Sequence, residues 1–255
     1  MTAHHGHFAP FAELMRAEGL PEVVIRTFAH YHEQLAAGET GLVPESAIEP
    51  VDDVPRSEDL GPEEAEIGRQ AMDRTVLLKL NGGLGTSMGL DRAKSLLTVK
   101  EGLTFLDIIA RQALHVGVPL VLMNSANTRD DSLAALARYD GLRGDIPLDF
   151  LQHRVPKVRQ DDLGPATCER DPALAWCPPG HGDLYTALDT SGMLETLLAH
   201  GYRYAFVSNA DNLGAVIDPS ILGHIVRNQL PFLMEVAPRT EADRKGGHLA
   251  RRPDG

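Results

Sequence analysis

The chain has 255 residues, of which 24 are Lys or Arg and 36 are Asp or Glu, so its formal net charge is −12. This length suits one large domain with a sizeable core, and 43% hydrophobic with 24% charged residues is typical of a globular rather than a disordered protein. The acidic balance argues against a general binder of nucleic acid or anionic membranes, because such a protein needs a basic surface.

The charge is unevenly distributed along the chain. Residues 1–74 hold 5 basic and 15 acidic side chains, which leaves 19 basic and 21 acidic side chains for residues 75–255. We therefore expect an acidic N-terminal segment over residues 1–74 and a nearly neutral domain over residues 75–255, which can accept an anionic ligand.

Cysteine usage and the N-terminus bear on the location of the protein. Cys168 and Cys177 are the two cysteines, with no second pair to complete a zinc site, and they favour a reducing cytoplasm over a disulfide scaffold. No apolar run approaches the ~20 residues of a membrane span, and the start MTAHHGHFAP lacks the pattern of a signal peptide. We expect a cytoplasmic protein without a membrane partner. His4, His5 and His7 favour a frayed polar terminus over a metal site.

The N-terminal segment is predicted to be helical. Residues 9–37 contain two helices, the second opening with Pro21 and closing at Gly38, which is the favoured punctuation of a helix. Residues 38–62 carry four prolines among acidic residues and predict a linker or an extended wrap. Residues 61–73 predict a short helix with acidic side chains in its first turn.

From Thr75 onward, short apolar runs alternate with amphipathic segments. The expected strands are residues 75–80, 119–125, 147–152, 202–209 and 231–238, and the expected helices are residues 104–117, 128–141, 182–201 and 218–229. Such an alternation predicts a mostly parallel sheet covered on both faces. Ligands of such sheets collect at the carboxyl ends of the strands.

A glycine-rich segment, KLNGGLGTSMGLDRAKS (79–95), follows the first of these strands. Its glycines allow positive φ and close approach to a ligand, its exposed amides can form an anion nest, and Lys94 can add a positive charge for phosphate. The spacing excludes a Walker A loop, and Met88 stands where the dinucleotide fingerprint needs glycine. Phosphate binding is the favoured interpretation, and a glycine-rich surface turn is the alternative.

Two further segments follow strands or precede helices. Gln152, in LQHRVPKV (151–158), offers an amide that suits the edge of a nucleobase, although a glutamine at a strand end is more often a solvated cap. In WCPPGHGDL (176–184), prolines and glycines hold His181 on a constrained loop just before a helix. This context favours a functional histidine over a structural one.

The last two segments carry oxygen-bearing and basic side chains. In SNADNLGAVID (208–218), Asn209, Asp211 and Asn212 offer oxygens at a strand end, which suits either Mg²⁺ or an Asx-rich turn. In MEVAPRTEADRKGGHLA (234–250), Glu235 can bind sugar hydroxyls and Lys245 can bind phosphate, although an exposed charged turn explains the segment as well.

Taken together in this order, the five segments resemble the eukaryotic type of UTP–glucose-1-phosphate uridylyltransferases, also called UDP-glucose pyrophosphorylases. The matching residues extend from Lys79 to Gly247, and the residues that carry the resemblance are KLNGGLGTSMG, Gln152, PPGHGD, SNADNLG and MEV with KGG. The resemblance implies a Rossmann-like nucleotide-diphospho-sugar transferase fold, a three-layer α/β/α sandwich with a mixed, mostly parallel sheet, preceded by the helical N-terminal segment.

The resemblance also implies roles for individual residues. UTP would be bound by Leu80, Asn81, Gly82, Gly83, Lys94, Gln152, Gly180 and Asn209. Lys94 would be the catalytic residue at the phosphates, and Asp211 would hold a Mg²⁺ cofactor. The sugar phosphate would be bound by His181, Glu235, Lys245 and Gly246. The expected reaction forms UDP-glucose and pyrophosphate from UTP and glucose 1-phosphate, with a homo-oligomer left open as a further partner.

Two departures from the family pattern leave alternatives. Ala93 stands where the family usually has proline before the lysine. Family members also continue well beyond the KGG segment, whereas this sequence reaches Gly255, so we expect a chain truncated at its C-terminus, corresponding to the front of a longer enzyme. The alternatives are a UDP-N-acetylhexosamine pyrophosphorylase and a truncated UTP-binding module without activity.

Overall fold

The computed structural model describes residues 5–51, 53–84, 92–142, 144–238, 240–241, 247 and 249–253. Its contacts form two compact units, the first made of residues 1–38 and 73–216 and the second of residues 39–72 and 217–255. The boundary at residue 74 rests on charge and composition and stays a prediction. Among the described helices, none combines the length and the apolar character that crossing a bilayer requires.

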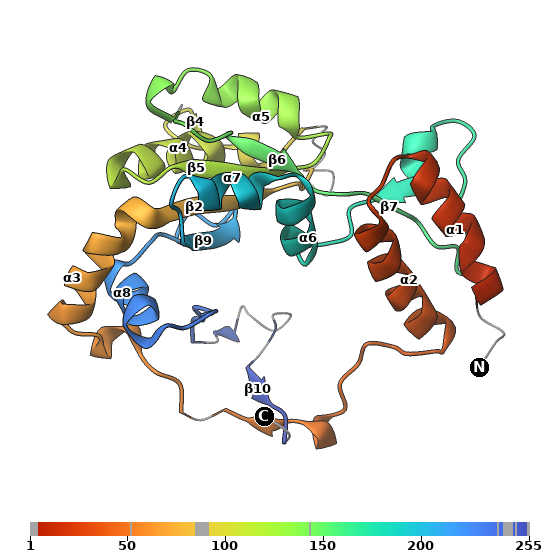
Figure 1. Ribbon diagram of the computed structural model, residues 1–255, viewed down its shortest axis with the longest axis horizontal. Helices are drawn as coiled ribbons and strands as arrows, with labels where there is room; N and C mark the ends of the chain where they lie inside the picture. Colours follow the sequence, from red (N-terminus) through yellow and green to blue (C-terminus); the bar gives the residue numbers. More distant parts are fainter. Residues whose placement is uncertain are drawn as a thin grey trace. The chain divides into compact units, whose positions relative to one another are not determined.

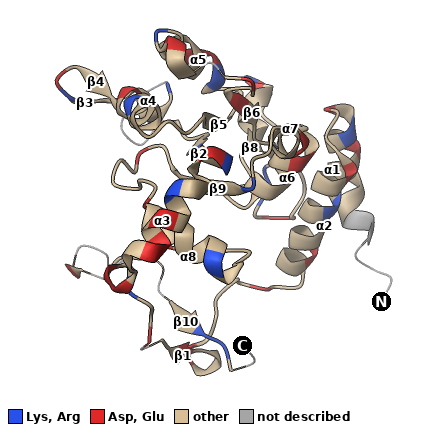
Figure 2. Ribbon diagram, turned by 60° about the vertical axis from the view of Figure 1, so that its left-hand side comes forward, with Lys and Arg blue, Asp and Glu red and all other residues tan. Residues whose placement is uncertain are grey.

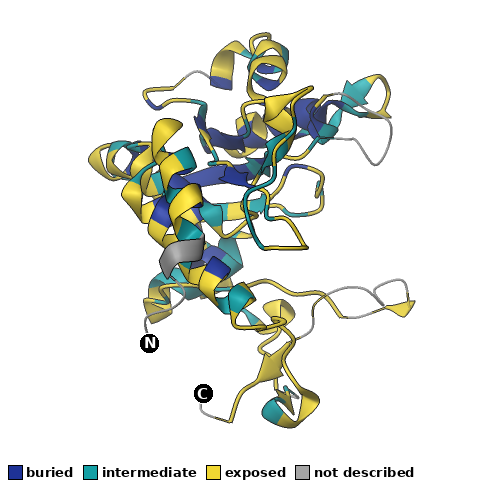
Figure 3. Cartoon of the chain, turned by 90° about the vertical axis from the view of Figure 1, so that its right-hand side faces the viewer, coloured by how far each residue is buried: buried dark blue, intermediate teal, exposed yellow. Residues whose placement is uncertain are grey.

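A parallel four-stranded sheet forms the centre of the first unit. Its strands lie in the order β6-β5-β2-β9, and every neighbouring pair is parallel. Their bounds are β2 Thr75–Asn81, β5 Leu120–Asn124, β6 Asp149–Leu151 and β9 Tyr204–Asn209. The side chains of β5 are all buried, as the dark blue strands of Figure 3 show. Four of the predicted strands are thereby confirmed.

Helices cover both faces of this sheet (Figure 1). On one face, Val76 and Leu78 of β2 pack against Leu184 of α6 and Leu197 of α7. The other face carries Asn81, which bonds to α5. The helices are α4 Phe105–Val116, α5 Arg129–Leu136, α6 Asp183–Thr190 and α7 Met193–Ala199. This is the expected three-layer α/β arrangement.

The predicted helix over residues 182–201 is two helices in the structure. Gly192 lies between α6 and α7 with a φ of 75°, a left-handed conformation that favours glycine and ends the first helix. The chain therefore turns at Gly192, where a continuous amphipathic pattern predicted one element.

Helix α4 begins with a reciprocal cap. The Thr104 hydroxyl accepts a hydrogen bond from the Asp107 N–H at 3.1 Å, and the Asp107 carboxylate accepts one from the Thr104 N–H at 2.9 Å. Arg138 and Tyr139 also donate to this carboxylate. Burial acts to raise the pKa of Asp107, but these hydrogen bonds outweigh it and hold the pKa at about 2.

The two N-terminal helices, α1 His5–Ala17 and α2 Glu22–Ala36, pack against a small hairpin of the same unit. The hairpin consists of β7 Val155–Pro156 and β8 Trp176–Cys177, and its Val155 and Trp176 join the apolar cluster of Met15 and Ile25. The guanidinium of Arg154 lies 5.0 Å from the centre of the Trp176 ring and pairs with Glu18. A second hairpin joins β3 Thr98–Lys100 to β4 Leu103–Thr104.

The second unit contains α3 Pro62–Ala71 and α8 Pro219–Asn228, which cross at Gly68 and Gly223. Arg227 donates to Glu64 at 2.7 Å, and the acidic start of α3 is red in Figure 2. Strand β1 Glu49–Pro50 pairs antiparallel with β10 Ala250–Arg251.

Both units also contain short 3₁₀ helices. Within the described residues these are Glu45–Ala47, Ser57–Asp59, Met72–Arg74, Lys94–Leu96, Asp140–Leu142 and Pro172–Ala175.

The strand predicted over residues 231–238 is wrong for this structure. The segment has no strand pairing within the described residues, and Phe232 and Met234 are 62% and 63% exposed. A short apolar run forms a strand only where a neighbour satisfies its backbone hydrogen bonds. By contrast, the described parts of residues 38–62, which are 38–51 and 53–62, adopt the extended path with short turns that their prolines predict.

Candidate functional site

A cavity of about 240 Å³ lies at the carboxyl ends of the parallel strands. It is lined by ten of the residues that the motifs predict and by four others. The predicted residues are Leu80, Asn81, Gly82, Gly83, Lys94, Gln152, Gly180, His181, Asn209 and Asp211, and the others are Ser95, Met123, Pro178 and Ala210. The fold thus gathers segments more than 100 residues apart, because parallel strands place their carboxyl ends at one edge of the sheet.

The glycine segment lets Gln152 lie directly over the backbone. A Cβ atom at Gly82 would lie 2.4 Å from Oε1 of Gln152, so a larger residue there would push this amide out of its present position. The Gln152 N–H donates to the carbonyl of Asn124 at 2.8 Å, which fixes the residue just after β6. The side-chain amide of Gln152 therefore faces the cavity beside Gly82 and Gly83.

Both ends of the glycine loop are held together. Leu84 and Ala93 form an antiparallel bridge, and the Lys94 N–H donates to the Gly83 carbonyl at 3.1 Å. Lys94 is half-buried at the start of a 3₁₀ helix and faces the cavity. Gly85 and Gly89 of the predicted anion nest lie outside the described residues.

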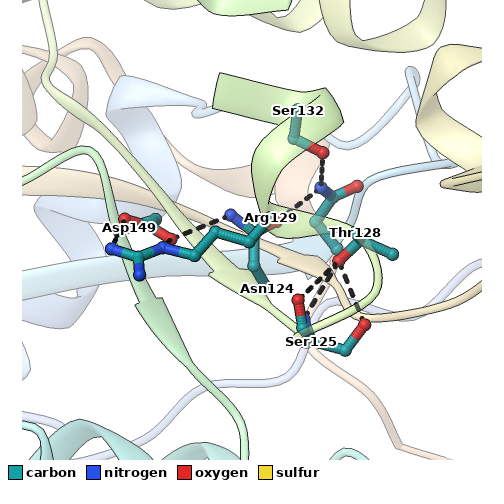
Figure 4. A network of polar contacts seen from close by, with 7 residues as sticks. Asn124, Ser125, Thr128, Arg129, Ser132 and Asp149 are labelled. Carbon is teal, nitrogen blue, oxygen red and sulfur yellow. Dashed lines mark hydrogen bonds and ion pairs between the residues drawn. The ribbon is translucent and has the colours of Figure 1, made fainter. Parts of the chain in front are cut away.

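Asn81 belongs to a buried polar network, and Figure 4 shows three other members, Asn124, Ser132 and Asp149. The Asn81 amide donates to Asn124 at 2.7 Å and to Ser132 at 2.8 Å, and its oxygen accepts from Ser95 at 2.5 Å. Asn124 donates in turn to Asp149. Asn81 is only 3% exposed, so its side chain is committed to this network. Asn81 supports the cavity indirectly, because its hydrogen bond to Ser95 ties the residue after Lys94 to the sheet.

Asn209 ends β9, which pairs with β2 on the side away from β5, and Asp211 follows two residues later. The first turn after β9 is fixed by the Ala210 N–H, which donates to the Leu80 carbonyl at 3.1 Å. Both Asn209 and Asp211 are exposed and line the cavity. The Asn212 side chain instead accepts from the Ala215 N–H at 3.2 Å, in the manner of an Asx turn.

The Pro178–His181 segment forms another wall of the cavity. Gly180 has a φ of 108°, which disfavours residues with a side chain, and His181 follows it on the exposed surface. Two residues later, the Asp183 carboxylate accepts hydrogen bonds from the backbone N–H and the ring of His153, at 2.7 and 2.8 Å.

Three predicted residues are not placed at this cavity. Glu235 is exposed in the second unit, and Lys245 and Gly246 lie outside the described residues. Within the described chain, no group of three or more His, Cys, Asp and Glu side chains could hold a metal ion. The single carboxylate of Asp211 instead fits an ion that shares its ligands with phosphate oxygens, as Mg²⁺ commonly does.

Two of the lining residues that were not predicted, Ser95 and Met123, carry weak sequence signals or none. Ser95 is signalled by its place beside Lys94, whereas Met123 lies within a continuous apolar strand that only predicts core. A larger hollow of about 410 Å³ beside α4, near Lys100, Arg111 and His115, collects none of the predicted residues.

Comparison with known proteins places these features in context. The family model of UTP–glucose-1-phosphate uridylyltransferase matches residues 25–255. The Solanum tuberosum protein of this name is 46% identical over 188 residues, covering 71% of this chain and 39% of its own length. The Saccharomyces cerevisiae protein of this name is 46% identical over 185 residues, with coverages of 70% and 37%.

Solved structures match nearly the whole chain. The UDP-glucose pyrophosphorylase from Leishmania major is 45% identical, with a TM-score of 0.89 over 98% of this chain and 53% of that protein. The UDP-glucose phosphorylase from Trypanosoma brucei is 46% identical, with a TM-score of 0.86 over 97% and 53%. The chain thus spans about 40% of the curated relatives and about half of the solved ones.

Proposed function

Because the chain belongs to the UTP–glucose-1-phosphate uridylyltransferase family, we propose that its cavity binds UTP and glucose 1-phosphate and forms UDP-glucose and pyrophosphate. The observation that supports the proposal is the convergence of ten motif residues on one cavity at the carboxyl ends of parallel strands. The L. major pyrophosphorylase whose fold it shares was solved with UDP-glucose in several mutant forms.

The nucleotide end of the cavity is formed by Leu80 to Gly83 and Gln152. An amide offers one donor and one acceptor side by side, which matches the N–H and C=O groups on the edge of uracil. Gly82 leaves room for this amide, and a flat base can approach the backbone of Gly83 without a side chain between them.

The phosphate end carries the charges that the reaction needs. Lys94 supplies a positive charge from one side, and Asp211 would hold Mg²⁺ from the other, together with phosphate oxygens. When bound, Mg²⁺ neutralises phosphate charge as a Lewis acid. His181 and Asn209 line the remaining walls and would contact the sugar phosphate and the reacting phosphates, with Glu235, Lys245 and Gly246 proposed as further sugar-phosphate ligands.

The reaction is an in-line displacement at phosphorus. A phosphate oxygen of glucose 1-phosphate bonds to the α-phosphorus of UTP as the bond to the bridging oxygen breaks, and pyrophosphate leaves with that oxygen. The attacking oxygen is already anionic near neutral pH, so no strong general base is needed. The residues of the cavity act by holding the two anions in line and by stabilising their charge.

We place the reaction in the cytoplasm, because both cysteines are free thiols.

Variants of the two charged residues test the proposal. Lys94→Ala and Asp211→Ala should each lower the rate of pyrophosphate release from UTP and glucose 1-phosphate by roughly 10²–10³-fold, as expected for the loss of one preorganised charge contact. Lys100→Ala, at an exposed lysine of β3, is the control and should retain the parent rate.

Three outcomes of this assay would change the proposal. Near-normal release in either cavity variant would overturn the assigned roles. A preference for N-acetylglucosamine 1-phosphate would move the protein to the related hexosamine reaction. UTP binding by calorimetry without any pyrophosphate release would identify the chain as a nucleotide-binding module.

A further inference from the structure

Lys79 is a buried cation that the proposed reaction does not use. It interrupts the apolar run of β2, and none of its surface is exposed. Within the described chain, no carboxylate is close enough to shift its pKa, and burial alone lowers that pKa to about 8. A buried ammonium group without a counter-charge is costly, so its presence in a central strand calls for a compensating role.

The side chain of Lys79 joins the sheet to the segment that follows β9. In the parallel register of β2 and β9, Lys79 lies opposite Ser208, and its Nζ donates to the Ser208 hydroxyl at 2.6 Å. The same Nζ donates to the Ala215 carbonyl at 3.2 Å and lies 5.9 Å from the centre of the Phe206 ring. A lysine suits this position because its long stem carries several donors to acceptors in different segments.

The segment of residues 209–216, hereafter the β9 loop, is held at three points. The Ala210 N–H donates to β2 at the carbonyl of Leu80. The side chain of Gln112, from α4, donates to the carbonyl of Leu213 at 3.1 Å. The third point is Ala215, whose carbonyl accepts a hydrogen bond from Lys79 of β2. Asp211 lies between the first two anchors, and its carboxylate reaches the cavity without a hydrogen-bond partner among the described residues.

We propose that Lys79 is a positioning residue that fixes the β9 loop against the sheet and thereby holds Asn209 and Asp211 at the rim of the cavity. The consequence for ligand binding rests on the proposed function, because it assumes that Asp211 meets Mg²⁺ and phosphate there. The anchoring itself does not depend on that function. A charge-assisted hydrogen bond to a carbonyl in a buried site is stronger than a neutral one, which suits a loop whose own side chains face solvent.

Amide hydrogen exchange of the ligand-free protein tests the anchor directly. Lys79→Met keeps a long unbranched side chain, one atom shorter, but removes both hydrogen bonds and the charge. We expect exchange in peptides covering residues 210–216 to become at least about tenfold faster, as for the loss of one to two net hydrogen bonds, while peptides of β5 keep the parent rate. Lys100→Met, the same substitution at an exposed lysine, is the matched control and should change nothing.

Two exchange results would overturn the proposal. One is an unchanged rate in residues 210–216. The other is faster exchange spread over the whole first unit, which would assign Lys79 to global stability alone. If Lys79→Met does not fold, Gln112→Ala removes the neighbouring anchor from a half-buried helix position, and it should accelerate exchange in the same peptides. Parent-like exchange in that variant would equally count against an anchored β9 loop.

Calorimetry of UTP binding tests the functional consequence. We expect Lys79→Met to weaken UTP binding about tenfold in the presence of Mg²⁺ and less than threefold in EDTA. The reason is that Asp211 contributes to UTP binding only through the Mg²⁺ ion that it is proposed to hold. Equal affinities for the parent and the variant in Mg²⁺ would overturn the positioning role. If the parent itself binds no UTP in either condition, the proposed function fails, and the exchange experiment still decides whether Lys79 anchors the loop.

Discussion

At the scale of single residues, the Asp183 carboxylate connects the segment after Gln152 to the segment after His181, and both of these residues line the cavity. Asp183 accepts from both the backbone and the ring of His153, and the two side chains are only 5% and 11% exposed. The other ring nitrogen of His153 hydrogen-bonds to the Thr190 hydroxyl at 3.0 Å, so both ring nitrogens have partners. His153 follows Gln152, and Asp183 closely follows His181, so this pair couples the residues that face the base and the sugar phosphate.

Replacing His153 should therefore disturb binding as well as stability. In His153→Leu, the Asp183 carboxylate stays buried with only the backbone N–H as a partner, which should lower the free energy of unfolding by about 1–3 kcal/mol. UTP affinity, measured by calorimetry, should fall about tenfold because Gln152 and His181 lose their common support. Asp162→Ala, which breaks an exposed pair with Arg159, is the matched control and should leave both quantities unchanged. Parent-like UTP affinity in His153→Leu would show that the two walls are independent.

At the scale of elements, the contact between α3 and α8 depends on two glycines. A Cβ atom at Gly68 would lie 1.7 Å from the Pro219 carbonyl oxygen, and one at Gly223 would lie 1.7 Å from that of Glu64. The two backbones thus approach each other without side chains between them. Because the contacts are with backbone rather than with a movable side chain, the helices can accept a methyl group only by separating.

Gly223→Ala should consequently destabilise the protein although it improves helix propensity. Propensity alone would stabilise α8 by about 1 kcal/mol, whereas overpacking at a fixed contact typically costs about 1–3 kcal/mol or more. We expect a lower urea midpoint by circular dichroism and faster amide exchange in α3 and α8. Gln70→Ala, on the exposed face of α3, should leave the midpoint within error. A stabilised Gly223→Ala variant would mean that the two helices do not cross this closely.

The comparison of sequence with structure is also instructive at this scale. The four parallel strands and most helices were predictable, because each combines an apolar period with recognisable ends, such as Thr104 and Gly117 of α4. Phe232 and Met234 show the limit, since a short apolar run does not reveal whether a neighbouring strand exists. The motifs likewise singled out ten residues that line the cavity, but also Glu235, which does not. They could not predict that the side-chain amide of Asn81 is hydrogen-bonded to Asn124, Ser132 and Ser95, because hydrogen-bond partners depend on three-dimensional packing.

At the scale of the whole molecule, the N-terminal helices belong to the support of the cavity. Their apolar cluster includes Val155 and Trp176, which lie in the hairpin strands that lead from Gln152 and into Pro178. His32 of α2 also bonds to the carbonyl of Leu163 at 3.0 Å, across 131 positions of the chain. No motif in residues 1–38 predicts this, since the helices contribute packing rather than ligand contacts.

This arrangement makes the single tryptophan a reporter of the unit that holds the cavity. All residues that line the cavity lie in that unit, so a ligand bound there stabilises it by mass action. At a UTP concentration about 100 times Kd with Mg²⁺, the gain is about 2.7 kcal/mol, and the midpoint of thermal unfolding followed by Trp176 fluorescence should rise by about 5–10 °C. ATP at the same concentration should give a smaller rise, because adenine lacks the N–H and C=O groups of the uracil edge that the proposed pairing with Gln152 uses. An equal rise with ATP or with inorganic triphosphate would show that the cavity recognises phosphate charge alone and that Gln152 does not select the base.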